Sequence, residues 1–313
     1  MRPSRLVLLP LLMSAVAAAA PRAQAPAPTM AGYPAVGARA IVTLVQPGAA
    51  PRTAMRYRVA STYKTSVDIV TTMDMAMNLG GMPMPMSMPA TRMTIELAVT
   101  EVAANGDITY GLTFTQASLD ASDGNPLAAA MQGSIAMLNG LKGTGTITSR
   151  GVTKSARLGT GETGDPALAQ ALTQVISTLQ NLVMPFPEEA VGVDARWEVR
   201  TALESNGMHV FQKSTYELVS MSGPSVTLKV SSEQVAPPQA VSMPGMPPGV
   251  EATLEKFSGS GLGSYTFRLD GLAGTGEMES TNSTAVGVNM GGNPQSVSSE
   301  LKIKVTIAPT PVK

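Results

Sequence analysis

The sequence predicts a mainly β fold: a strongly curved, half-barrel-like antiparallel sheet of two pseudo-repeats, with one central amphipathic helix and a shorter second helix. Three observations lead to this prediction. Runs of alternating or β-branched residues recur between turn residues, similar β-type segments occur in both halves of the chain, and only two stretches show helical spacing.

Strands are expected where apolar and polar residues alternate, because successive side chains of a strand point to opposite faces. The expected strands cover residues 41–45, 55–60, 66–77, 93–102, 108–114, 145–149, 197–203, 214–219, 226–230, 265–269 and 301–307. Two turns share the pattern Asn-x-Gly-Gly-x-Pro, at 78–83 and 289–294. Asparagine and glycine tolerate positive φ, so both turns are expected at the ends of long β-arms.

The two halves of the chain resemble each other at a nearly constant offset. Residues 94–97 (TIEL) match 215–218 (TYEL), and residues 143–150 (GTGTITSR) match 261–268 (GLGSYTFR). We therefore expect two pseudo-repeats, over residues 40–160 and 193–308.

A helix is predicted over 166–184, which would join the repeats and lie across the inner face of the sheet. Asp165 can cap it, Pro166 suits its first turn and Pro185 ends it. Its apolar stripe supplies the candidate ligand contacts Leu168, Leu172, Val175, Ile176 and Leu179. Its other face is polar but uncharged, which fits either a helix covered by loops or ligand, or a surface helix of a weakly charged protein. The shorter helix is expected from Asn125 to about Leu138.

The first 25 residues have the pattern of a secretory signal, with Arg2 and Arg5 before an apolar run over 6–20. Cleavage is expected near Ala19 or Ala25, and export to the periplasm or the exterior follows. Residues 26–39 predict a flexible Pro/Ala-rich leader, and residues 40–313 a single β-rich domain. Beyond the signal, no apolar stretch approaches the roughly 20 residues of a membrane helix.

The composition argues against several classes of function. The 22 basic and 22 acidic residues leave no net charge to attract nucleic acid. The chain has no cysteine, which removes disulfides, thiolate metal sites and a cysteine-linked lipid anchor. His209 is the only histidine, and no nucleophile elbow accompanies it. A protein that is not an enzyme is therefore expected.

Methionine is the outlier in the composition. Seven methionines alternate along the first arm and beyond its turn: Met73, Met75, Met77, Met82, Met84, Met86 and Met88. Alternation places each set on one face of a strand, and thioether sulfur is a soft ligand suited to Cu(I). Methionine is also an adaptable apolar filler, so a contact surface or plain packing are the other interpretations. Pro83, Pro85 and Pro89 predict that regular strand pairing fails in this stretch.

Three short motifs resemble those of an uncharacterised family of exported bacterial β-rich proteins, many of them lipoproteins. They are PGAAPR at 47–52 before MRYR at 55–58, LxGxxG at 138–143 before 144–147, and PFPEEAVG at 185–192 before Trp197. At the level of the fold, the predicted sheet also resembles the half-barrels that carry lipoproteins or lipids across the periplasm. This resemblance implies an apolar cavity and transfers no functional residue.

The expected function is non-catalytic binding of an apolar or lipid-like ligand, or of another envelope protein, by the concave face and the arms. The alternatives are a Cu(I)-binding periplasmic protein, with the methionines as ligands, and a structural envelope protein.

Overall fold

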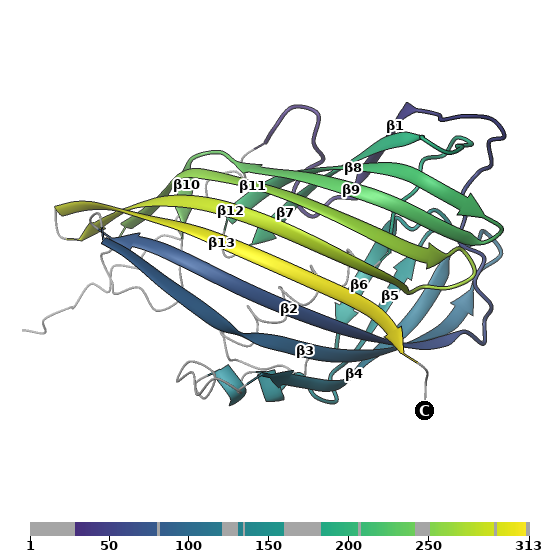
Figure 1. The fold of residues 1–313 in the computed structure, drawn as a ribbon, viewed down its shortest axis with the longest axis horizontal. Helices are drawn as coiled ribbons and strands as arrows, with labels where there is room; N and C mark the ends of the chain where they lie inside the picture. The colour runs from purple at the N-terminus through teal and green to yellow at the C-terminus, as the bar shows by residue number, and fades with distance from the viewer. Residues whose placement is uncertain are drawn as a thin grey trace, which may run out of the picture.

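In a computed structural model, residues 29–79, 82–120, 131–133, 135–159, 183–205, 208–241, 251–290 and 293–310 are described. These residues are mainly β, as expected, and form one large antiparallel sheet that is not closed. The strands run in the order β1-β7-β8-β9-β11-β12-β13-β2-β3-β4-β5-β6, and β10 pairs with β11. Figure 1 shows the sheet curving so that β5 and β6 lie behind the long front strands.

The strands differ greatly in length, and the longest form the arms. The bounds are β1 (Ile41–Gln46), β2 (Lys64–Leu79), β3 (Met82–Val102), β4 (Ile108–Leu119), β5 (Lys142–Ile147), β6 (Thr153–Leu158), β7 (Arg196–Ser205), β8 (Met208–Ser222), β9 (Ser225–Ala236), β10 (Gln239–Val241), β11 (Glu251–Arg268), β12 (Gly274–Met290) and β13 (Asn293–Thr310). The two predicted long hairpins are present. Leu79 pairs with Met82 at the tip of one, and Met290 pairs with Asn293 at the tip of the other.

The C-terminal strand joins the two halves of the sheet. β13 pairs with β12 on one side and with β2 on the other, where Ile307 lies opposite Ile69 and Leu301 opposite Met75. Figure 1 shows β13 between these two strands. The N-terminal strand β1 pairs with β7, so β1 and β6 form the two edges of the open sheet.

The two faces of the sheet differ in what they carry. We call the face that bears the buried core the inner face, and the opposite face the outer face. Directly paired residues of neighbouring strands share a face, so the strand register assigns every strand residue to one of them. The inner face includes Ile69, Ile95, Phe114, Leu218 and Leu228, which are all fully buried.

Two irregular segments, 53–60 and 183–191, cross the inner face and fill one end of the sheet. They pair briefly with each other, because the backbone N–H of Thr53 donates to Val191 and that of Val191 donates to Thr53. Tyr57 and Phe186 of these segments pack with aromatic residues of β7, β8 and β11. We call this group the aromatic plug and define it as Tyr57, Phe186, Trp197, Tyr216 and Phe267. Phe186 stacks on Tyr57 with ring centroids 4.9 Å apart, and Trp197 stacks on Tyr216 at 5.6 Å.

The prediction of a strand over 55–60 was wrong. The backbone N–H of Tyr57 donates to Ser149 O and that of Arg58 to Leu269 O, so this segment bridges two turns instead of joining a ladder. Met55, Tyr57 and Val59 are nevertheless buried in alternation, because an extended segment that lies on a sheet buries every second side chain. The alternating pattern therefore reflects side chains that pack on the inner face of the sheet, and not a strand paired in a ladder.

Sequence reasoning did not find β6, β10 and β12, and it placed the start of β3 too late. The expectation that the prolines interrupt pairing was also wrong, since β3 pairs with β2 from Met82 to Ala98. The described pairing of β3 with β4 begins only at Thr91. On the side of β3 that faces β4, residues 82–89 are thus not paired with another described strand. Such an edge tolerates Pro83, Pro85 and Pro89, because a proline has no N–H to donate to a neighbouring strand.

The helical predictions fall largely outside the described residues. Residues 166–182 are among those not described, so the helix there stays a prediction, whereas Val183 and Met184 at its predicted end are described and not helical. Of the shorter one, residues 131–133 and 135–136 are helical, followed by turns over 137–140. Within the described part of the chain, no helix has the length and apolar character needed to cross a membrane. The pseudo-repeats also stay a prediction, although β3–β4 and β8–β9 each carry a register shift, between Val99 and Glu101 and between Leu218 and Ser220.

Candidate ligand-binding face

The inner face of the long strands carries no charge. In the described residues of β2, β3, β4 and β7 to β13, the register places every Asp, Glu, Lys, Arg and His on the outer face. The ion pairs agree with this assignment, since Lys304–Glu279 and Arg196–Glu217 join outer-face residues of neighbouring strands. Segregation of this kind makes the inner face suitable for uncharged molecules.

A band of neutral polar residues crosses the inner face beyond the aromatic plug. We call it the neutral belt; in register across β7, β8, β9, β11 and β12 its main row is Thr201, Gln212, Gln234, Gly259 and Asn282. The next row toward the plug contains the buried Ser214 and Ser232. On the far side of the belt lies a second apolar cluster of Val210, Ala236, Val241, Ala252 and Leu254.

The amide groups of the neutral belt form a directed chain of hydrogen bonds. Gln234 Nε2 donates to Gln212 Oε1 at 2.7 Å, and Gln212 Nε2 donates to Ser214 Oγ at 3.0 Å. Tyr216 follows on β8, and burial raises the pKa of its hydroxyl, which therefore stays neutral. The belt is thus ordered by its own contacts and holds no ionised group.

A cavity of about 290 Å³ lies where the two ends of the curved sheet approach each other. Its walls come from the segment 37–40, from 151–156 at the start of β6, and from inner-face residues of β7 and β8 that include Thr201, Gln212 and Ser214. The cavity therefore opens directly onto the neutral belt. Its size is at the lower end of the range of small-molecule pockets.

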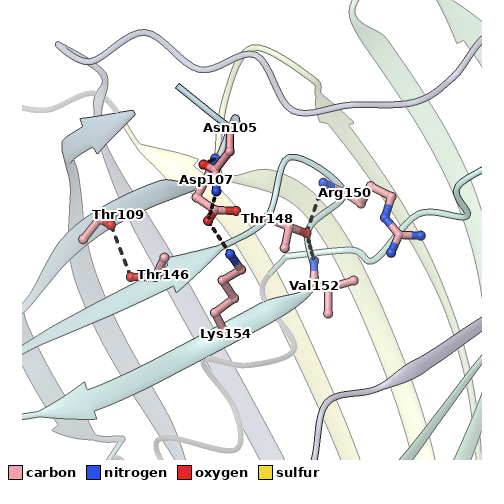
Figure 2. Close-up of polar contacts among 8 residues, drawn as sticks. All are labelled: Asn105, Asp107, Thr109, Thr146, Thr148, Arg150, Val152 and Lys154. Carbon is pink, nitrogen blue, oxygen red and sulfur yellow. Dashed lines mark hydrogen bonds and ion pairs between the residues drawn. The ribbon is translucent and has the colours of Figure 1, made fainter. Parts of the chain in front are cut away.

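Polar contacts fix the wall of this cavity that comes from the β5–β6 turn (Figure 2). Thr148 Oγ1 accepts hydrogen bonds from the backbone N–H groups of Arg150 and Val152, at 3.3 and 3.2 Å. The Lys154 ammonium donates to the Asp107 carboxylate, and this hydrogen bond holds the pKa of Asp107 below its ordinary value. Lys154 lines the cavity, so its charge is balanced there by Asp107; Arg39 is the second charged residue of the lining.

The predicted methionine set lies on the inner face of β2 and β3, which β13 separates from the last strand of the neutral belt. The register brings Met73 opposite Met88, Met75 opposite Met86, and Met77 opposite Met84. We call these six residues the methionine ladder; Met82 follows it at the tip. The exposed fractions are 69% for Met82, 53% for Met84 and 40% for Met86, which is unusual for large apolar side chains. Asn282 pairs with Leu301, Leu301 with Met75, and Met75 with Met86. The neutral belt and the methionine ladder therefore lie at the same height along the strands.

The other predicted site residues are not part of this face as described. Leu168, Leu172, Val175, Ile176 and Leu179 lie outside the described residues. His209 lies on the outer face of β8, where its backbone N–H donates to Gln239 Oε1 at 2.9 Å. Among the residues that the structure describes, no three His, Cys, Asp or Glu side chains gather as a metal site would require.

Sequence reasoning missed the neutral belt. Its glutamines, serines and glycines lie in alternation on strands, but polar residues at inner positions look like outer ones when the register is unknown. The available signal was the absence of charged residues over 257–267 and 280–299.

Comparison with known proteins gives no relative to argue from: no protein-family model matches the chain, and no curated protein matches it. The function must therefore be argued from the inner face itself.

Proposed function

We propose that this protein binds an apolar, lipid-like molecule on the inner face of its sheet, without catalysing a reaction on it. The observation that carries the proposal is the segregation of charge. The outer face of the long strands bears their charged residues, whereas their inner face is uncharged in the described residues of β2 to β4 and β7 to β13.

The methionine ladder supports the same proposal. Exposed apolar residues that lie side by side mark binding surfaces more often than scattered ones do. Burial of a methionine side chain contributes about 1.5–3 kcal/mol, so covering Met84 and Met86 with an alkyl chain would supply a few kcal/mol of binding free energy. Methionine side chains are also flexible, which suits contact with chains of varied length and shape.

Binding of the fluorescent apolar probe 1-N-phenylnaphthylamine to the purified full chain tests the proposal. We expect saturable binding, weakened at least about tenfold in Met84→Glu/Met86→Glu, because each change places a charge where the ligand excludes water. The matched control is Ser298→Glu/Glu300→Gln on the outer face of β13, which should bind like the parent protein. Absence of saturable binding, or equal binding by both variants, would count against the proposal.

A second candidate function rests on a separate observation, the register of the methionine ladder. Directly opposed side chains have Cβ atoms about 4.5–5.5 Å apart, so sulfurs from Met75, Met86 and a diagonal neighbour can reach one ion. Thioethers favour Cu(I) over harder metals, and no thiol or nearby histidine is needed. This arrangement would make the protein a Cu(I) carrier or buffer.

Leucine substitutions separate the two functions, because leucine keeps the apolar volume of methionine and removes the sulfur. Native mass spectrometry with Cu(I) should show a stoichiometric adduct that is lost in Met75→Leu/Met77→Leu/Met84→Leu/Met86→Leu. Binding of the apolar probe should change less than about threefold in the same variant. Met278→Leu, elsewhere on the inner face, is the control. An adduct that persists in the fourfold variant would refute the copper site.

A further inference from the structure

Two acceptor oxygens of the neutral belt converge over one glycine. A Cβ atom placed on Gly259 would lie 2.2 Å from Asn282 Oδ1 and 3.0 Å from Gln234 Oε1. The two side chains come from β12 and β9, which flank β11, and both lean over the position that lacks a side chain. Gly259 therefore leaves room for two carbonyl oxygens to face the same point.

The hydrogen bonds of these amides leave acceptor capacity there. Gln234 uses its Nε2 to donate to Gln212, so its carbonyl oxygen is the group turned toward Gly259. Asn282 Oδ1 is buried and accepts no hydrogen bond from the described residues. A buried carbonyl oxygen without a donor is costly, and such groups in native proteins usually have a partner. The pair of oxygens is suited to a group that donates hydrogen bonds.

The charge of the surroundings decides which kind of donor fits. Two carbonyl oxygens repel an anion, and the described inner face of β8 to β12 offers no cation to compensate. A carboxylate or phosphate would also lose its hydration on this face. A neutral hydroxyl or amide N–H has the required donor and no net charge to desolvate.

We infer that the Gly259 site, formed by Gly259, Gln234 and Asn282, binds the hydroxyl or amide donors of a neutral polar head group. Its ligand is then an amphiphile with an uncharged, hydroxylated head, such as a glycerol ester, whose apolar chain lies along the methionine ladder. The common row from Asn282 through Leu301 to Met75 places head and chain at one level of the sheet. This inference rests on the proposed function and adds the chemical class of the ligand.

The test compares 1-monododecanoylglycerol with dodecanoate at pH 8, each displacing 1-N-phenylnaphthylamine from the full chain. The two ligands share an eleven-carbon alkyl chain on the carbonyl and differ in the head group. We expect the glycerol ester to bind at least about tenfold more tightly, the effect of one or two hydrogen bonds on a buried site. Asn282→Leu should reduce this preference to within about twofold.

Two further variants complete the design. Gly259→Ala should lower the affinity for the glycerol ester about tenfold, because the new methyl group would displace the two acceptor oxygens that lie over this position. Thr281→Leu, on the outer face beside Asn282, should leave the preference intact. The fluorescence of Trp197, which is fully buried, confirms that each variant folds.

Two results would overturn the inference. The first is dodecanoate binding to the parent protein as tightly as the ester, and the second is an unchanged preference in Asn282→Leu. If the first result is found, loss of dodecanoate binding in Arg39→Gln would assign head-group binding to the cavity lining. Failure of the fluorescent probe to bind would instead refute the proposed function, and the inference with it.

Discussion

Removal of one hydroxyl group from the aromatic plug, in Tyr57→Phe, should destabilise the whole fold. Tyr57 Oη donates to Met184 O at 3.3 Å and accepts from Met184 N–H at 3.2 Å, and both residues are buried. Burial raises the pKa of Tyr57, so the hydroxyl stays protonated and keeps both roles. The substitution leaves a buried N–H and a buried C=O without their partner.

The magnitude follows from these two bonds. Each contributes about 0.5–1.5 kcal/mol net, so their loss should lower the free energy of unfolding by about 2 kcal/mol. Urea unfolding followed by the fluorescence of Trp197 measures this directly, because Trp197 is the single tryptophan of the chain and lies in the plug. Linear extrapolation of the unfolding free energy gives the difference from the parent protein.

Tyr110→Phe is the matched control. Tyr110 is also buried on the inner face, but its hydroxyl makes no hydrogen bond to the residues that the structure describes. Its loss should therefore change the unfolding free energy by less than about 0.5 kcal/mol. Equal effects of the two substitutions would show that the hydroxyl of Tyr57 does not hold the segment 183–191 in place.

Two other predictions follow from the plug and from the cavity wall. Phe186→Ala, at a fully buried position, should cost about 3–5 kcal/mol in the same urea titration, and a cost below about 1 kcal/mol would mean that the plug does not support the sheet. The hydrogen bond from Lys154 lowers the pKa of Asp107 in the folded protein. The interaction therefore stabilises the fold at pH values above the pKa that Asp107 has in the unfolded chain. This stabilisation is lost as the pH falls through the pKa of Asp107 in the folded protein. Asp107→Asn should accordingly remove part of the acid-side decline in melting temperature, and superimposable pH profiles would contradict this assignment.

The fold was predictable where one face of a strand is apolar. β2, β4 and β9 alternate clearly, and their predicted ranges lie within the observed ones. β12 was missed because the inner positions of its first half, apart from Met278, are small or polar: Gly274, Gly276, Ser280, Asn282 and Thr284. Gly276 carries no side chain, since a Cβ there would lie 2.2 Å from the ring of Tyr265 on β11. A neighbouring strand thus supplies the apolar surface that β12 itself lacks, and no local pattern reveals that.

The candidate site was predictable only in part. The alternation of the methionines placed each set on one face, and the structure adds that the two sets are directly opposed. The neutral belt could not be predicted, because it depends on the pairing of five strands. Gln212, Gln234 and Asn282 lie far apart in the chain, and only the register brings them into one row. The ligand contacts proposed for the predicted helix lie outside the described residues.

The central position of β13 has a consequence for the order in which the protein can assemble. β13 comprises residues 293–310, near the end of the chain, yet it separates β12 from β2. During synthesis from the N-terminus, one ladder edge of β2 and one of β12 stay unpaired until β13 has been made. Contacts between residues so distant in sequence form slowly, and unpaired edges invite association with other chains. These edges are therefore exposed until β13 pairs with both strands, and truncation of the chain before residue 293 should yield two half-sheets that aggregate.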